Sequence, residues 1–246
     1  MILRQMLHRD PVAISYLFGC GGKAAAAVVD PVGDIAPYIT AAQDTGMRIL
    51  HVIDTHIHAD HLSAGPELAR AVGAPYVLFV DADAALPFRG VHDGEVIELG
   101  NVTIKVLHTP GHTPEHMCLL VTDRTRAEEP WFVLTGHTLM VGDLGRTELA
   151  ASATDGARTL FGSIQRLKAQ PDYLEVLPGA CAGSACGRRL SGNPASTIGF
   201  ERLHNAAFRI DDEAEFVRAM TAEIPLPPTN AAEIRAVNAG KTTKAA

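Results

Sequence analysis

Four side chains that commonly bind metals crowd into the stretch DTHIHADHLSAG, residues 54–65. They are His56, His58, Asp60 and His61. Zinc and iron(II) are bound in proteins by imidazole and carboxylate groups of this kind. Burying so many polar groups without partners would cost several kcal/mol. The cluster therefore predicts a metal site.

Further ligands are expected from other strand ends. The segment LHTPGHTPEHM contains three histidines, and His112 is the preferred ligand because it lies in a glycine-flanked turn after a strand. His116 is the near alternative, while His108 is expected within or beside the strand. His137 follows the apolar run WFVLTG and completes a set drawn from three separate strand ends.

The spacing of the cluster predicts two ligand positions. On a strand, His56 and His58 would point to the same face and hold one metal together. Asp60 and His61 would follow in the turn and face a neighbouring position. Two preceding polar residues are candidates to fix the tautomer of a ligand imidazole: Asp54 and Thr55.

Strands and helices that position these residues alternate along the chain. Expected strands cover 24–30, 47–53, 76–80, 117–123, 131–136 and 173–179, with a hairpin at 95–111 that turns at Gly100–Asn101. Expected helices cover 34–46, 63–74, 155–170 and, as the last one, 213–223. The mixture of hairpins and crossovers favours two sheets between helices over one doubly wound parallel sheet.

Composition excludes several classes of protein. The 246 residues carry a net charge of −7, which argues against nucleic acid as a partner. No apolar run approaches the length of a membrane span, and the first residues do not resemble a secretory signal. Four irregularly spaced cysteines do not form a disulfide framework and indicate free thiols in a reducing cytoplasm.

The motifs THIHADH, TPGHTPEH, TGHTLMVGDLGRTEL and LPGACAGSACG resemble those of the metallo-β-lactamase fold superfamily, and in particular its persulfide dioxygenase branch. The likeness runs over nearly the whole chain. It implies one α/β domain, residues 1–246, with the αββα four-layer sandwich of the superfamily. It also implies one Fe(2+) per chain at positions that correspond to His56, His112 and His137.

An enzyme of this branch oxidises glutathione persulfide with O2 to sulfite and regenerates glutathione, in sulfide detoxification. The resemblance further suggests a homodimer and a separate rhodanese that could supply the persulfide. Arg146 matches an arginine near the family site, where it could pair with a ligand carboxylate or orient the loop. Other candidates are named on the same basis: Arg188 and Arg189 for the carboxylates of glutathione, and Cys181 as a ligand or sulfur acceptor.

Two positions depart from the family pattern. His137 replaces the aspartate of the family T-G-D motif, and Ala180 replaces the histidine of its P-G-H motif. Both changes weaken a two-metal hydrolase more than a one-metal oxygenase, because they remove a bridging carboxylate and a ligand of the second metal. Asp143 could replace the lost carboxylate by swinging in. Two alternatives stay open: a Zn(2+) hydrolase acting on a thioester or lactone, and a non-catalytic protein that binds metal or thiol.

Overall fold

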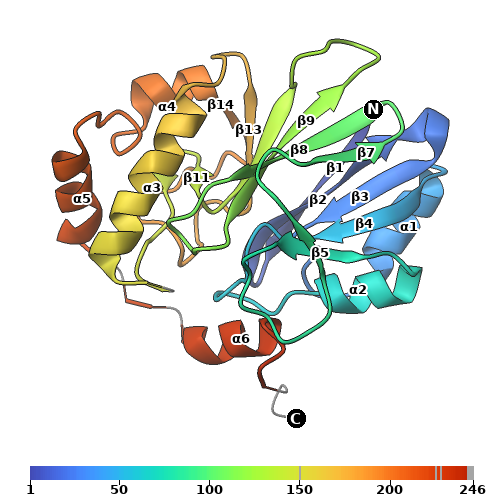
Figure 1. The fold of residues 1–246 in the computed structure, drawn as a ribbon, viewed down its shortest axis with the longest axis horizontal. Coiled ribbons are helices and arrows are strands. Elements are labelled where there is room, and N and C mark those ends of the chain that lie inside the picture. Colours follow the sequence, from blue (N-terminus) through green and yellow to red (C-terminus); the bar gives the residue numbers. More distant parts are fainter. Residues whose placement is uncertain (150, 225, 228, 243–246) are drawn as a thin grey trace.

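Two six-stranded sheets form the middle of the molecule (Figure 1). The computed structural model describes residues 1–149, 151–224, 226–227 and 229–242. The first sheet contains, in spatial order, β1 (Ile2–Arg9), β2 (Val12–Cys20), β3 (Ala25–Val29), β4 (Arg48–Ile53), β5 (Tyr76–Phe79) and β6 (Arg89–Val91). The second contains β14 (Ser196–Thr197), β13 (Glu175–Pro178), β10 (Phe132–Gly136), β9 (Met117–Asp123), β8 (Val102–His108) and β7 (Val96–Leu99).

Helices cover the outer faces of both sheets. The first sheet packs against α1 (Ala36–Asp44) and α2 (Gly65–Val72), and the second against α3 (Ala153–Lys168), α4 (Ile198–His204) and α5 (Glu213–Ala222). A 3-10 turn (Gly21–Lys23) and a small hairpin of β11 (Leu139–Met140) and β12 (Asp143–Leu144) complete these elements. The predicted αββα sandwich is therefore confirmed, and Figure 1 shows the two helical layers on opposite sides.

The central core lies between the sheets because alternate residues of the strands point inward. Phe18 of β2 meets Phe132 of β10 edge to face, with ring centroids 5.7 Å apart. Val29, Ile104 and Leu119 are fully buried in the same cluster. This core fixes the two sheets against each other, so the loops at their common edge keep defined positions.

Parallel pairing in the first sheet brings the end of β4 beside the end of β3. The histidine-rich loop starts directly after β4, and Asp30 follows β3. In the second sheet, β8 and β9 are antiparallel and their joining loop carries His112, while β10 ends immediately before His137. Three loops from two sheets therefore meet at one edge.

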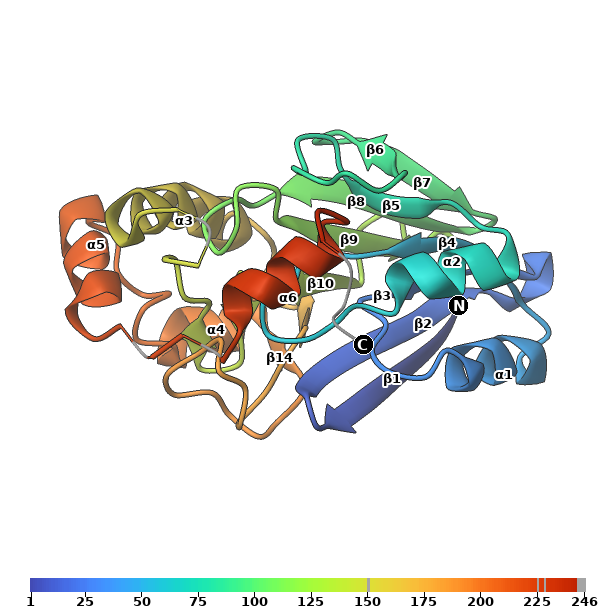
Figure 2. The same ribbon diagram turned by 90° about the horizontal axis from the view of Figure 1, so that it is seen from below.

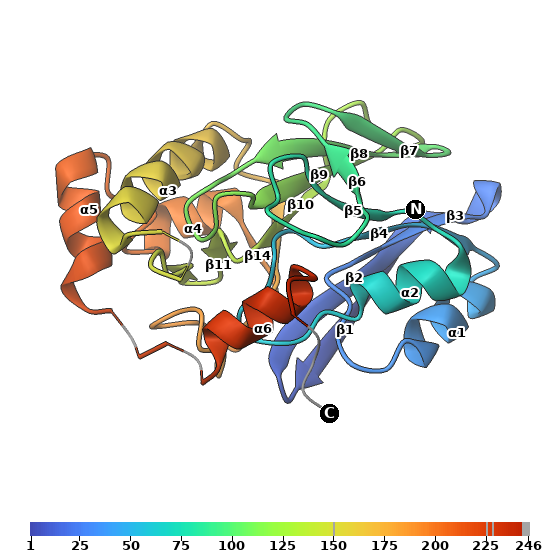
Figure 3. The ribbon, with the colours of Figure 1, turned by 60° about the horizontal axis from the view of Figure 1, so that its bottom comes forward.

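Most elements expected from the sequence are present, but the structure departs from the prediction in several places. The β1–β2 hairpin, the short strands β6, β11, β12 and β14, and helix α4 were not expected. The helix at Glu213–Ala222 is not the last one, because α6 (Ala231–Asn238) follows it and lies across the edge that carries the loops (Figures 2 and 3). His56 and His58 do not lie on a strand, because β4 ends at Ile53. Within the described part of the chain, every helix is too short or too polar to traverse a lipid bilayer.

Candidate metal centre

His56 is held by the residue that precedes it. The Thr55 hydroxyl donates to Oδ2 of Asp30 at 2.9 Å, and Nδ1 of His56 lies 2.9 Å from the same hydroxyl oxygen. Because the hydroxyl proton is already used, Nδ1 of His56 must carry a proton and donate it to Thr55. The other ring nitrogen, Nε2, is buried and has no hydrogen-bond partner among the described residues. Its lone pair is therefore available to a metal.

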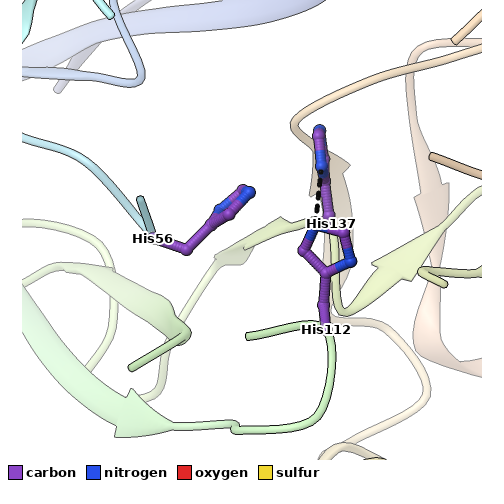
Figure 4. Close-up of side chains that lie close together, drawn as sticks. All are labelled: His56, His112 and His137. Atoms are coloured by element: carbon purple, nitrogen blue, oxygen red, sulfur yellow. Dashed lines mark hydrogen bonds between the residues drawn. The ribbon is translucent and has the colours of Figure 1, made fainter. Parts of the chain in front are cut away.

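His112 is oriented in the same way by a carbonyl group. Its Nδ1 lies 2.7 Å from the backbone oxygen of Arg146, which can only accept, so Nδ1 carries the proton. Its other nitrogen, Nε2, is hydrogen-bonded to Nδ1 of His137 at 3.3 Å (dashed line in Figure 4). Nε2 of His137 is buried, again without a hydrogen-bond partner in the described structure.

The three imidazoles converge from separate loops, as Figure 4 shows. One nitrogen of each of His56, His112 and His137 lies within 4.8 Å of the other two. Burial lowers the pKa of His56 well below its ordinary value, that of His112 to about 3 and that of His137 to about 4. All three are therefore neutral near pH 7, which is the form that binds metals.

An unpaired buried polar atom costs about 1–3 kcal/mol. The unpartnered nitrogens of His56 and His137 therefore fit a metal ion better than a metal-free apolar pocket. Three ligands leave coordination positions open for other molecules. The residues present thus suit a catalytic transition metal.

His58 is not in this group of three, although its ring centroid lies 4.2 Å from that of His56, so a metal shared by the two stays a prediction. Its Nε2 lies 3.2 Å from Oδ1 of Asp30. Burial by itself would lower the pKa of His58, but the carboxylates of Asp30, Asp54 and Asp60 raise it to about 9. These carboxylates therefore favour the protonated form of His58.

Asp60 and His61 lie beside His58 in a second group of potential ligands. Nδ1 of His61 is 3.1 Å from Oδ1 of Asp60. Burial would raise the pKa of Asp60, but the neighbouring histidines, His61 first, hold it well below its ordinary value. The expectation of a neighbouring position for Asp60 and His61 agrees with this grouping.

His116 and Gly136 help to position the loop that carries His137. Nε2 of His116 accepts from the backbone N–H of His137 at 3.0 Å, which makes His116 a structural partner of that loop. Gly136 has φ of +48°, and a Cβ there would lie 2.6 Å from both Nε2 of His116 and Oγ1 of Thr55. Only glycine fits between these side chains without displacing one of them.

Helix α6 contacts the histidine-rich loop, a role that the sequence did not indicate. Nδ2 of the buried Asn238 donates to the carbonyl groups of His58 and His61 at 2.9 and 2.8 Å, and its Oδ1 accepts from the N–H of Ser63 at 3.0 Å. Asparagine in an amphipathic helix gives no signal of such a role, because its partners are about 180 residues away.

A second contact from α6 runs through Glu115. Its carboxylate accepts from the N–H of Ile57 at 3.0 Å and from Nη2 of Arg235 at 3.1 Å. Arg235 also donates to the carbonyl of Ile57 at 2.7 Å. Glu115 therefore joins the loop of His112, the loop of His56 and α6 into one hydrogen-bonded unit.

Arg146 takes part in the site through its backbone and forms an ion pair with Glu148 through its side chain. Its guanidinium contacts Glu148 and donates to the carbonyls of Ala185 and Leu226. Glu148 is not one of the predicted ligands, so a pair of Arg146 with a ligand carboxylate stays a prediction, while the backbone carbonyl of Arg146 accepts from Nδ1 of His112.

Asp143 and Arg188 form an ion pair with N–O distances of 3.0 Å and above. Asp143 also accepts from the backbone N–H of Arg188 and of Arg189. Because the Asp143 carboxylate is used in these bonds, it does not replace the carboxylate that is missing at position 137. The ion pair with Asp143 also engages the Arg188 side chain, which was expected to contact the carboxylates of glutathione.

Cys186, not Cys181, lies at the site. The sulfur of Cys186, a carboxylate oxygen of Asp60 and a nitrogen of His137 are all within 4.8 Å of one another. Cys181 packs at the rim of the central core instead, which corrects the expectation that it is the thiol of the site. All four cysteines are free, as expected.

Comparison with known proteins places this geometry in context. The family model described as "Metallo-beta-lactamase superfamily" matches residues 13–179. A metallo-beta-lactamase from Staphylococcus aureus has 35% identity and a TM-score of 0.91, covering 96% of this chain and 72% of the other. The crystal structure of ETHE1 from Myxococcus xanthus has 28% identity and a TM-score of 0.84, covering 98% of this chain and 100% of the other.

Among curated proteins, the human mitochondrial persulfide dioxygenase ETHE1 is 27% identical over 229 residues, 92% of this chain and 84% of the relative. Bacterial hydroxyacylglutathione hydrolases match about 67% of this chain.

Proposed function

Because this chain belongs to the metallo-β-lactamase superfamily, we propose that it is an iron-dependent persulfide dioxygenase. The substrate is glutathione persulfide or a similar low-molecular-weight persulfide. With O2 and water it yields the thiol and sulfite. The similarity to persulfide dioxygenases over nine-tenths of the chain supports this choice of reaction.

The observation that carries the proposal is a group of three neutral, buried imidazoles, each with a nitrogen within 4.8 Å of the other two, in which Nε2 of His56 and of His137 has no hydrogen-bond partner among the described residues. His56, His112 and His137 would hold one Fe(2+), which supplies the open positions and the electrons needed to activate O2. Thr55 and the carbonyl of Arg146 keep the Nδ1 protons of His56 and His112 in place, so both rings present Nε2.

An Fe(2+) ion held by three neutral imidazoles would keep a formal charge of +2, whereas one carboxylate ligand would reduce that charge to +1. This charge favours an anionic persulfide sulfur over a neutral thiol or thioester. Burial of the ligands also strengthens the attraction, because the effective dielectric constant is lower there than in water. The four free thiols fit a reducing compartment, so we place the reaction in the cytoplasm.

Metal analysis on protein purified without oxygen tests the proposal first. We expect about one iron per chain in the wild type, little in His137→Ala and retention in His137→Asp, because the carboxylate restores a ligand. Oxygen uptake should then require both iron and glutathione persulfide. Iron that survives His137→Ala would show that this imidazole is no ligand.

A zinc hydrolase is the second candidate. Asp60 and His61 form a ligand group beside the first one, and hydroxyacylglutathione hydrolases are among the relatives. Such an enzyme would contain zinc and hydrolyse a thioester without consuming O2. Stoichiometric zinc with thioester turnover would favour it over the oxygenase.

A further inference from the structure

Ser15 and Tyr38 form a buried polar cluster with His8, next to the turn that follows β3. Ser15 lies on β2 and Tyr38 on α1, and the two residues are 0% and 1% exposed. Their side-chain oxygens lie 3.0 Å apart. Nε2 of His8, on β1, lies 3.0 Å from the Ser15 oxygen and 3.2 Å from the Tyr38 oxygen. Buried polar groups cost free energy unless they are hydrogen-bonded, so the remaining bonds of this cluster indicate what it holds.

Both hydroxyl groups bind the main chain of the turn at residues 30–32. The Ser15 hydroxyl donates to the backbone oxygen of Asp30 at 2.6 Å. The Tyr38 oxygen accepts from the N–H of Val32 at 2.8 Å and lies 3.1 Å from the carbonyl oxygen of the same residue. Asp30 has φ of +49°, a left-handed conformation that is uncommon for residues with a side chain. Such a conformation persists where the surrounding structure holds it, and Ser15 and Tyr38 supply bonds of this kind.

Asp30 in turn sets the position of Thr55 and, through it, of His56. Oδ1 of Asp30 accepts from the N–H of Thr55 at 2.7 Å, and Oδ2 accepts from the Thr55 hydroxyl at 2.9 Å. The oxygen of that hydroxyl accepts from Nδ1 of His56 at 2.9 Å. Because the Asp30 carboxylate is attached to a backbone that the polar cluster holds, a shift of the turn would move the imidazole of His56.

We propose that Ser15 and Tyr38 are positioning residues of the metal centre, which act through Asp30 and Thr55 on the orientation of His56. The proposal rests on the three-histidine centre of the proposed function, but not on the reaction or on the identity of the metal. Residues behind a metal ligand fix the direction of its ring, so their loss lowers metal affinity and changes the geometry around the metal.

Metal affinity and the visible spectrum of the cobalt(II) form test the proposal in the full chain. Ser15→Ala removes the bond to Asp30, and Tyr38→Phe removes the contacts to Val32. We expect each change to raise the Kd for cobalt(II), measured by competition with a chelator, by about 10-fold. Each should also shift the d–d bands, because the direction of one ligand imidazole changes. Ser15→Thr keeps a hydroxyl and should restore the wild-type Kd and spectrum.

Val28→Ala is the matched control for a general loss of stability. Val28 lies on β3, is fully buried, and packs in the apolar cluster that also contains Tyr38. Its truncation removes apolar contacts without removing a side-chain hydrogen bond. The variant should therefore lower the Tm and leave both the Kd and the cobalt spectrum as in the wild type. An equal loss of affinity in Val28→Ala would assign the effect of Ser15→Ala to stability and overturn the proposal.

Amide hydrogen exchange of the metal-free protein separates this proposal from the proposed function. The N–H of Thr55 donates to Asp30, so Ser15→Ala should speed its exchange by about 2- to 10-fold. The neighbouring N–H of Asp54 donates to the carbonyl of Val77 and should keep its wild-type rate. Wild-type protein that binds no metal would refute the metal centre. Unchanged exchange at Thr55, or an unchanged Kd in Ser15→Ala and Tyr38→Phe, would overturn the positioning role itself.

Discussion

Asn238→Ala tests whether α6 positions the metal ligands. The change deletes two donated hydrogen bonds to the carbonyls of His58 and His61 and one accepted from Ser63. At about 0.5–1.5 kcal/mol for each bond, the free energy of unfolding should fall by about 2–4 kcal/mol. For a chain of this size, that lowers the Tm by about 5–15 °C.

The same change should weaken metal binding. The two carbonyls belong to the loop that carries His56, so their release lets this ligand move relative to His112 and His137. Residues that support metal ligands typically contribute a factor of 10 to 100 in affinity. We therefore expect the Kd for cobalt(II), measured by competition with a chelator, to rise by about 10- to 100-fold.

A matched control separates this effect from a general loss of stability. Glu233→Ala changes an exposed residue of the same helix and should leave both the Tm and the metal Kd within error of the wild type. If Asn238→Ala lowers the Tm but leaves the metal Kd unchanged, α6 only stabilises the fold. An equal loss of affinity in Glu233→Ala would refute the positioning role as well.

The remaining predictions concern the other supports of the site. Thr55→Val removes the hydroxyl between His56 and Asp30 and should weaken metal binding by about 10- to 100-fold. Thr55→Ser keeps the hydroxyl and should not weaken metal binding. Chelator competition on both variants distinguishes the effect of the hydroxyl from that of the methyl group. Gly136→Ala should lower the free energy of unfolding by about 1–3 kcal/mol, because its Cβ would meet His116 and Thr55; an unchanged urea midpoint would contradict this. Arg235→Gln should reduce metal affinity less than Asn238→Ala, because Glu115 keeps its bond to Ile57; a larger loss would assign the main contact to Arg235.

The local sequence was sufficient to predict which residues could bind a metal and where most helices and strands lie. Apolar runs with period 2 and amphipathic segments specified the strands and helices, because these periods reflect burial on one face. Glycines and prolines marked the turns, as at Gly100–Asn101. The density of histidines in residues 54–65 indicated a metal site, since such polar clusters are costly to bury without one.

Only the tertiary structure decided which of the potential ligands lie together in one group. The sequence placed His56 and His58 side by side, yet Asp30, which follows a neighbouring strand, lies 3.2 Å from Nε2 of His58, and His58 is not in the group of His56. A loop has no fixed period, so side-chain directions there depend on partners that are distant in sequence. For the same reason, the sequence could not show that Cys186, and not Cys181, lies at the site. It also could not show the hydrogen bonds of Asn238 to His58 and His61, because these contacts exist only once both sheets and α6 have packed together.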